Sequence, residues 1–232
     1  MKLARLVPNA FTMLNLGSGC VGLIALTEHR FGWALFWVAL GIFFDFFDGF
    51  FARLLHVSSP LGIQLDSLAD MVTSGVTPGM AVMITLLDRF PSHSIWPYLG
   101  FVITLGSCYR LAKFNLDTRQ SDSFIGLPTP ANALFFLSWM FLIQQTPNLW
   151  MPWMSSTSLI MVMVGLSAWV MNAEIPLFSL KVKAPYSWQK YQVQILFLLF
   201  SIGCMAFLQW AAIPIIILVY VLTSVVVKPK SH

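Results

Sequence analysis

Charged side chains are scarce in this sequence: they make up 9% of its 232 residues, whereas a soluble domain carries about 25%. Hydrophobic residues account for 58% of the chain, and the mean hydropathy is +0.78. These values exclude an ordinary soluble domain. They predict an all-α integral membrane protein in which residues 1–232 form a single membrane domain.

Cysteine is also rare. Cys20, Cys108 and Cys204 are scattered through apolar segments without paired spacing, so we interpret them as reduced packing residues. The sequence contains no G-x-S-x-G elbow, no P-loop and no cysteine–histidine pair. His56 is the one histidine near the acidic stretch described below, and we expect it to be a loop residue. We expect no nucleic-acid partner.

Apolar segments fill most of the chain and predict about eight transmembrane helices. They cover residues 9–28, 31–55, 62–87, 94–114, 128–146, 155–172, 192–209 and 211–227. Pro78 predicts a kink or break in the third segment. The short basic start lacks an Ala-x-Ala cleavage site, so we expect the first segment to remain as a membrane helix.

Basic residues are distributed unequally between the two sides of this arrangement. Eleven fall on one side, namely Lys2, Arg5, Arg53, Arg110, Lys113, Arg119, Lys181, Lys183, Lys190, Lys228 and Lys230. Only Arg30 and Arg89 fall on the other. The positive-inside rule then predicts a cytoplasmic (inner) membrane protein with both termini in the cytoplasm. Residues 173–191 would form a cytoplasmic basic loop that contacts anionic lipid headgroups.

The stretch from Asp45 to Asp70 places four carboxylates inside apolar segments. Asp45 and Asp48 are three residues apart and Asp66 and Asp70 are four apart, so each pair occupies one helical face. A break at residues 56–60 is long enough to turn the chain back. Two antiparallel helices would then present four aspartates to one another, close to the cytoplasmic boundary.

Buried carboxylates need compensation, because an aspartate at mid-bilayer costs about 2.5–3.5 kcal/mol. Arg53 is the only arginine or lysine in the stretch and cannot neutralise four acids. Oxygen-only ligands favour hard divalent cations such as Mg²⁺, Mn²⁺ or Ca²⁺ over zinc. Salt-bridged interfacial acids are the alternative without metal.

Small residues accompany the acids on both predicted helices. Gly49 and Ala52 continue the face of Asp45 and Asp48, which leaves room for a flat or bulky ligand beside the metals. Gly62 precedes Asp66 by four residues and would let the two acid-bearing helices approach closely. Small-xxx-small helix packing is the competing interpretation.

These positions form the pattern D-x-x-D-G-x-x-A-R, eight residues, then G-x-x-x-D-x-x-x-D. It comprises Asp45, Asp48, Gly49, Ala52, Arg53, Gly62, Asp66 and Asp70. The pattern resembles the signature of the CDP-alcohol phosphotransferases, integral membrane enzymes of phospholipid synthesis. The resemblance implies a six-helix catalytic core at residues 9–172, two additional membrane helices at 192–227, and a homodimer.

The resemblance also implies roles for individual residues. Asp45 and Asp66 would bridge two metal ions, with Asp48 completing one site and Asp70 the other. Asp70 would also be the general base that takes the proton of the acceptor hydroxyl. The cytidine nucleotide would lie at Gly49 and Ala52, with Gly62 beside it, and the pyrophosphate would lie near Arg53 and Ser59.

Thr12 and Asn15 are polar, three residues apart and near the cytoplasmic surface. The residues alone leave nucleotide contact and hydrogen bonding within or between helices equally open. The run Pro8 to Asn15 is similar to the N-terminal element of the family, which favours nucleotide contact.

The acceptor alcohol is indicated by residues 109–115 and 124–131. R-L-A-K-F-N and F-I-G-L-P-T-P-A resemble the phosphatidylserine synthase branch of the family, although Ser74 to Pro78 departs from that branch's usual F-G-V-A-P. The implied reaction transfers a phosphatidyl group from CDP-diacylglycerol to L-serine. Arg110 and Lys113 would hold the serine carboxylate or the lipid phosphate, or serve only as positive-inside residues.

Two alternatives remain at this point. One is the same chemistry with another acceptor, such as glycerol 3-phosphate or inositol, and a phosphorylated acceptor should need extra cationic contacts. A divalent-cation transporter would use the aspartates as an ion path, and it predicts acids spread through the depth of the membrane.

Overall fold

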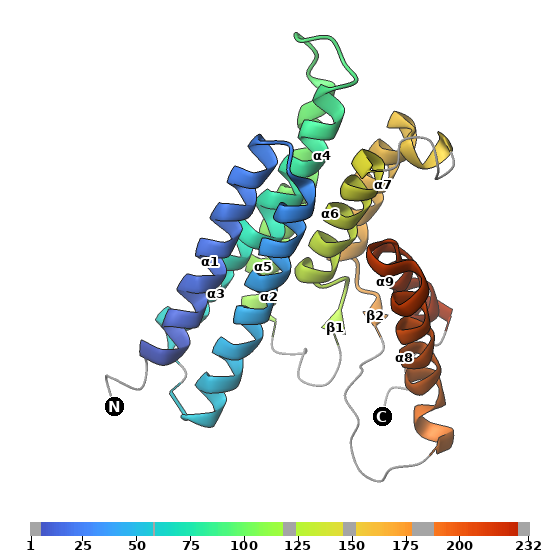
Figure 1. Ribbon diagram of the computed structural model, residues 1–232. Helices are drawn as coiled ribbons and strands as arrows, with labels where there is room; N and C mark the ends of the chain where they lie inside the picture. The colour runs from blue at the N-terminus through green and yellow to red at the C-terminus, as the bar shows by residue number, and fades with distance from the viewer. Residues whose placement is uncertain (1–5, 58, 118–123, 146–151, 178–187, 227–232) are drawn as a thin grey trace.

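The computed structural model describes all residues except 1–5, 58, 118–123, 146–151, 178–187 and 227–232, and the described chain is almost entirely helical (Figure 1). The α-helices are α1 (Leu6–Thr27), α2 (Phe31–Leu54), α3 (Pro60–Asp70), α4 (Thr77–Leu87), α5 (Phe101–Leu116), α6 (Thr129–Gln145), α7 (Thr157–Asn172), α8 (Trp188–Leu208) and α9 (Ala212–Val226). Short helical turns are η2 (Met71–Val76), η3 (Trp96–Gly100), η4 (Pro152–Ser155) and η5 (Gln209–Ala211). The predicted helical class is confirmed, with one small departure: β1 (Phe124–Ile125) pairs antiparallel with β2 (Pro176–Leu177).

Several helices are long and apolar enough to cross a bilayer, which makes this an integral membrane protein. By length and composition, four stretches of the described chain qualify: Leu6–Thr27, Phe31–Leu54, Pro60–Leu87 and Gln192–Val226. The last stretch is two helices, because η5 separates α8 from α9 and Gln209 has a φ of 49° there. The structure therefore separates the apolar segments predicted at 192–209 and 211–227 at the predicted boundary.

The third apolar segment is irregular in the middle. After Asp70 the backbone changes to the π-helical turn η2, and α4 then begins with Pro78 in its first turn. Proline has no N–H to donate to the preceding turn, so the break predicted at Pro78 takes this form. The carbonyl of Val72 accepts the backbone N–H of Thr77 across this wider turn, and the hydroxyl of Thr77 donates to the same carbonyl at 2.9 Å.

Helices α1 and α2 pack along their length, and α1 also contacts α3 and η2. A side chain at Gly41 of α2 would stand 2.8 Å from Thr73 Cγ2 and 2.9 Å from Asn15 Oδ1. The lack of a side chain at Gly41 is therefore what lets α1, α2 and η2 meet at one point. Gly41 is four residues before Asp45 and Thr73 is three after Asp70, so this crossing borders the acidic stretch.

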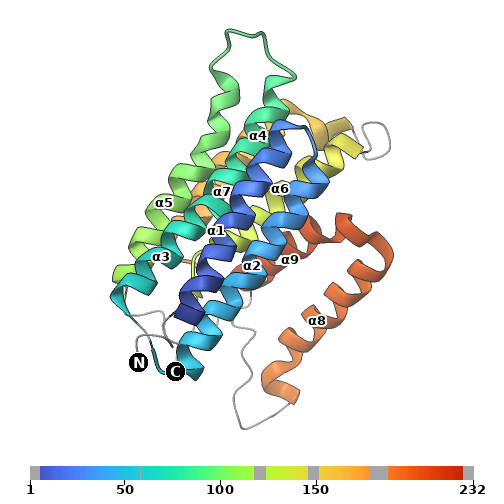
Figure 2. The ribbon, with the colours of Figure 1, turned by 60° about the vertical axis from the view of Figure 1, so that its left-hand side comes forward.

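The main apolar core lies at the opposite end of the bundle from the aspartates. Its fully buried side chains include Leu26, Leu35, Val38, Leu86, Ile103, Phe136, Leu137 and Met140, from α1, α2, α4, α5 and α6. Large apolar side chains such as Phe46, Leu105 and Phe207 point outward, as expected of helices in lipid. Helix α8 lies at the edge of the molecule and packs on α9, which packs on α6 (Figures 1 and 2).

Described basic residues separate between the two ends of the bundle. Arg53, Arg110 and Lys113 lie at the end where α2 and α5 finish, Lys190 lies in the first turn of α8, and Arg30 and Arg89 lie at the end opposite Arg53. Seven basic residues assigned to the cytoplasmic side, Lys2, Arg5, Arg119, Lys181, Lys183, Lys228 and Lys230, lie outside the described residues. Most of the predicted basic loop at 173–191 lies outside them too.

The crossing at Gly41 provides a stability test. Gly41→Ala should destabilise the protein by about 1–3 kcal/mol, because the added methyl group collides with Thr73 and Asn15. Gly17→Ala is the matched control, since nothing lies within 4 Å of a side chain there and alanine favours the helix. Thermal unfolding in detergent measures both variants. An unchanged or raised unfolding temperature for Gly41→Ala would contradict the observed packing.

Candidate metal centre and active site

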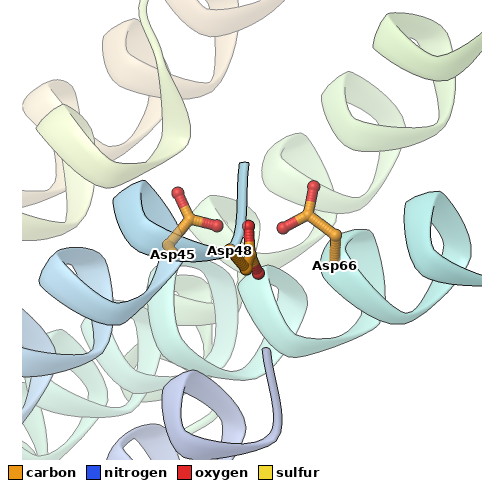
Figure 3. Close-up of side chains that lie close together, drawn as sticks. All are labelled: Asp45, Asp48 and Asp66. Atoms are coloured by element: carbon orange, nitrogen blue, oxygen red, sulfur yellow. The ribbon is translucent and has the colours of Figure 1, made fainter. Parts of the chain in front are cut away.

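Three carboxylates converge where α2 and α3 face each other. Asp45 and Asp48 project from α2, Asp66 projects from α3, and one oxygen of each lies within 4.8 Å of the others. Figure 3 shows the three side chains pointing into the same space between the two helices. The helical spacing of the acids thus produces the predicted cluster for these three residues.

The donor set fits a divalent cation. Oxygens of Asp45, Asp48 and Asp66 lie within 4.8 Å of one another, and ionised carboxylates this close repel each other unless a proton or cation lies between them. The Oδ1 atom of Asp66 is buried, with no hydrogen-bond partner among the described residues. Carboxylate oxygens are the ligands that Mg²⁺, Mn²⁺ and Ca²⁺ prefer. A hard cation would therefore satisfy both the orphaned oxygen and the mutual repulsion.

Asp70 lies one helical turn beyond Asp66 and outside the group of three within 4.8 Å. It is buried, and its charge acts on those of Asp45 and Asp66. Asn15 of α1 donates its side-chain amide to Asp70 Oδ1 at 3.1 Å. The bond fixes the Asp70 carboxylate at the edge of the cluster and leaves its other oxygen for a further partner.

Helix α1 supplies a second carboxylate partner. The hydroxyl of Thr12 lies 2.6 Å from Asp48 Oδ2 and 3.2 Å from the carbonyl of Pro8. Its single proton serves one acceptor at a time, and the shorter distance is to Asp48. Thr12 and Asn15 are thus brought to the acids, and the nucleotide contact predicted for them remains a prediction. The structure shows the alternative interpretation, in which side chains of α1 form hydrogen bonds to the neighbouring helices α2 and α3.

Arg53 follows the acids on α2. Its guanidinium nitrogen stands 3.5 Å from where a side chain on Gly49 would begin, and its charge acts on Asp48. Gly49 and Ala52 are half-buried beside it. Arg53 is exposed, so a cation is available at the mouth of the cluster for an anionic group.

Ser59 and Gly62 form the start of α3. Ser59 is the N-cap and accepts a hydrogen bond from the Gly62 N–H at 3.1 Å, with Pro60 following it in the first turn. A side chain at Gly62 would meet Ser59 Oγ and Asn9 of α1. The close approach predicted for Gly62 thus involves α1, whereas the sequence interpretation assigned it to the two acid-bearing helices. His56, in the preceding turn, is exposed with a φ of 51°, as predicted for a loop residue.

Arg110 is buried at the junction of α5, β1 and α7. Its guanidinium donates to the carbonyls of Ile125 at 2.9 Å, Gly126 at 3.2 Å and Met171 at 3.1 Å. Lys113, one turn further along α5, pairs with Glu174 at 3.7 Å. Both basic residues border a small pocket at this end of the bundle. Their predicted contact with an acceptor or phosphate remains a prediction.

Two features of the site escaped the sequence interpretation. Asn115 donates to the hydroxyl of Ser67 at 2.8 Å, which ties the end of α5 to α3 beside Asp66. Thr73 donates to the backbone carbonyl of Asn15 at 3.1 Å and fixes the residue that holds Asp70. In the sequence, Thr73 is visible only as a hydroxyl within an apolar segment, and this does not indicate which group it forms a hydrogen bond with.

A family model named CDP-alcohol phosphatidyltransferase matches residues 5–178, about three quarters of the chain. The chain therefore belongs to the CDP-alcohol phosphatidyltransferase family, and helices α8 and α9 lie beyond the matched range.

Individual relatives share one name, CDP-diacylglycerol–serine O-phosphatidyltransferase. The protein from Bacillus subtilis is 36% identical over 124 residues, covering 53% of this chain and 69% of that protein. The one from Helicobacter pylori strain J99 is 36% identical over 131 residues, covering 56% and 54%. The one from Mycobacterium tuberculosis strain H37Rv is 30% identical over 176 residues, covering 68% and 59%. The matches thus span between about half and about two thirds of these relatives.

Metal binding at the cluster can be tested by substituting one ligand. We expect Mn²⁺ to raise the unfolding temperature of the unaltered protein and to have little effect on Asp66→Asn. In the absence of metal, Asp66→Asn should unfold no earlier than the unaltered protein, because it relieves repulsion with Asp45. Asp88→Asn removes an exposed acid outside the cluster and is the control. Equal Mn²⁺ stabilisation of Asp66→Asn and the unaltered protein would place the ion elsewhere.

Proposed function

We propose that this chain transfers the phosphatidyl group of CDP-diacylglycerol to the hydroxyl of L-serine, giving phosphatidylserine and CMP. The observation that carries the proposal is the convergence of Asp45, Asp48 and Asp66 around an orphaned carboxylate oxygen, in a chain of this family. The printed names of its relatives support CDP-diacylglycerol and serine as the substrates. Glycerol 3-phosphate and inositol are the alternative acceptors.

The residues that would hold two divalent cations, Mg²⁺ or Mn²⁺, are Asp45, Asp48, Asp66 and Asp70, with Asp45 and Asp66 shared between the ions. When bound, the cations supply positive charge that neutralises the diphosphate as its phosphorus–oxygen bond breaks. Arg53 adds a positive charge of the protein's own at the mouth of the cluster. Thr12 orients Asp48 toward the cluster through its hydrogen bond.

Asp70 is our candidate for the general base. Asn15 donates to one of its oxygens, which stabilises the ionised form and leaves the other oxygen to accept the serine hydroxyl proton. The serine oxygen then bonds to the phosphorus that carries diacylglycerol, and CMP leaves with the bridging oxygen. Burial of Asp70 keeps bulk water from competing with serine for the phosphatidyl group.

We place the nucleotide over Gly49, Ala52 and Gly62, where small residues leave space beside the acids. Thr12 and Asn15 would border it from α1, while Arg53 and Ser59 would lie nearest the diphosphate. Ser59 already accepts a bond from Gly62, so its hydroxyl proton remains for a phosphate oxygen.

We further propose eight membrane spans with both termini and the metal centre facing the cytoplasm of an inner-membrane protein. The six-helix core would be residues 9–172, and α8 and α9 would be the additional hairpin. The presence of only Arg30 and Arg89 at the opposite end of the bundle, among the described arginines and lysines, supports this orientation. A homodimer rests on the family resemblance alone.

The reaction can be tested by CMP release from purified protein with CDP-diacylglycerol and Mn²⁺. We expect release to depend on L-serine and to be absent with glycerol 3-phosphate or inositol. Asp70→Asn should lower turnover by about 10²–10⁴-fold, the usual contribution of a general base, while Mn²⁺ still stabilises the variant. Turnover near that of the unaltered protein would remove Asp70 from the base role. Release driven by another acceptor would assign a different substrate.

Arg110 and Lys113 can be separated by a paired substitution. Arg110→Gln should lower the unfolding temperature, because it removes charged hydrogen bonds to three backbone carbonyls. Lys113→Gln should leave the unfolding temperature unchanged, since its pair with Glu174 is largely exposed, and should raise the KM for serine. Thermal unfolding and serine titration measure the two effects. An unaltered serine KM for Lys113→Gln would remove it from the acceptor site.

A further inference from the structure

A cavity of about 390 Å³ opens between α6, α7 and α9, apart from the metal centre. Its lining is almost entirely apolar and includes Phe135, Trp139, Met154, Leu159, Met163 and Leu218. The volume falls in the range of small-molecule sites, about 300–1,000 Å³. The proposed transfer reaction uses none of these residues.

A contact between α2 and α6 shows where the cavity lies along the length of the bundle. A side chain at Gly32, in the first turn of α2, would stand 2.9 Å from the ring of Phe141 on α6. Phe141 is adjacent in sequence to the cavity residues Leu142 and Ile143. Asp45 lies thirteen residues further along α2, a distance of about 20 Å in a helix. The cavity therefore lies in the half of the bundle opposite the aspartates.

Exposed tryptophans mark the membrane boundary at this end. Trp33 at the start of α2, Trp96 in η3, Trp153 in η4 and Trp210 in η5 are each about half exposed. Tryptophan is enriched at the level of lipid headgroups, so these exposed residues fit a membrane interface at this end of the bundle. Trp153 is itself a lining residue of the cavity, so the cavity adjoins this end of the bundle.

A positive charge lies at the rim. Arg89 is the second residue after α4 and is half-buried, and its guanidinium donates to the backbone carbonyl of Ser155, a cavity residue. Trp139 donates its ring N–H to the neighbouring carbonyl of Met154 at 3.2 Å. Burial lowers the pKa of Arg89, the charge of Asp88 raises it, and an arginine stays ionised in either case. A partly desolvated guanidinium has further donors that suit a phosphate oxygen.

We propose that this cavity binds an acyl chain of an anionic glycerophospholipid from the leaflet opposite the metal centre, with the lipid phosphate on Arg89. The apolar lining matches the chain and the cation matches the headgroup. The bound chain fills the space between α6, α7 and α9, so it fastens the α8–α9 hairpin to the rest of the bundle. This lipid is a structural ligand and is distinct from the substrate, whose diphosphate belongs at the aspartates.

The test uses the full chain in phosphatidylcholine nanodiscs that contain a trace of photoreactive phospholipid with a diazirine on one acyl chain. One probe carries a phosphatidylglycerol headgroup and the other phosphatidylcholine. After irradiation, mass spectrometry locates the labelled residues. We expect the phosphatidylglycerol probe to label α6, α7 and α9 at the cavity about tenfold more than the phosphatidylcholine probe, because the choline cation of the second probe offsets the attraction between its phosphate and Arg89.

Arg89→Gln should reduce phosphatidylglycerol labelling to the phosphatidylcholine level. Arg30→Gln is the matched control: Arg30 lies at the same end, pairs with Glu28 at 3.3 Å and borders no cavity residue in the described structure, so labelling should persist. Met163→Trp fills the cavity and should abolish labelling there by both probes. Retained stabilisation by Mn²⁺ would show that each variant is folded.

Four results would overturn the proposal. The first is absence of label at the cavity residues, and the second is equal labelling by the two headgroups. Suppression of the label by excess CDP-diacylglycerol would assign the cavity to the substrate. Cross-linking of two chains through cavity residues would assign it to a second copy. Because photolabelling requires no turnover, it can succeed or fail independently of the proposed transferase activity.

Discussion

Mutual repulsion among closely spaced carboxylates is the constraint around which this structure is arranged. Asp45, Asp48 and Asp66 bring oxygens within 4.8 Å of one another in a protein with few charges to offset them. Carboxylates this close need protons or cations between them. Without a cation, the negative charges on α2 and α3 repel one another. A cation placed between the two helices would attract the carboxylates of both.

Helix α1 keeps the cluster in register. Thr12 holds Asp48 and Asn15 holds Asp70, and Thr73 in turn holds the backbone of Asn15. The π-helical turn directly after Asp70 places Thr73 at the point where α1 and α2 cross at Gly41. Every acid therefore lies on a helix braced by packing and hydrogen bonds, as a preorganised site requires. The opposite half of the bundle contributes the apolar core and, in our proposal, a lipid that anchors α9.

The sequence predicted the acidic cluster because helical periodicity fixes which residues share a face, and the turn at residues 56–60 fixes which helices meet. Hydrophobic patterning likewise predicted the helical membrane class and the break near Pro78. The partners of Thr12, Asn15 and Gly62 could not be predicted, since the packing of α1 against two helices leaves no periodic signal. Arg110 illustrates the same limit: one basic residue at a helix end is compatible with a substrate contact or with three backbone carbonyls, and only tertiary structure supplies the carbonyls.

The most direct test of the account is anomalous diffraction from crystals grown with Mn²⁺ and CDP-diacylglycerol. The account predicts two manganese peaks between α2 and α3, within bonding distance of Asp45, Asp48, Asp66 and Asp70, with the diphosphate beside them. Manganese found only at other acids, or a nucleotide bound with no ion between the two helices, would contradict it.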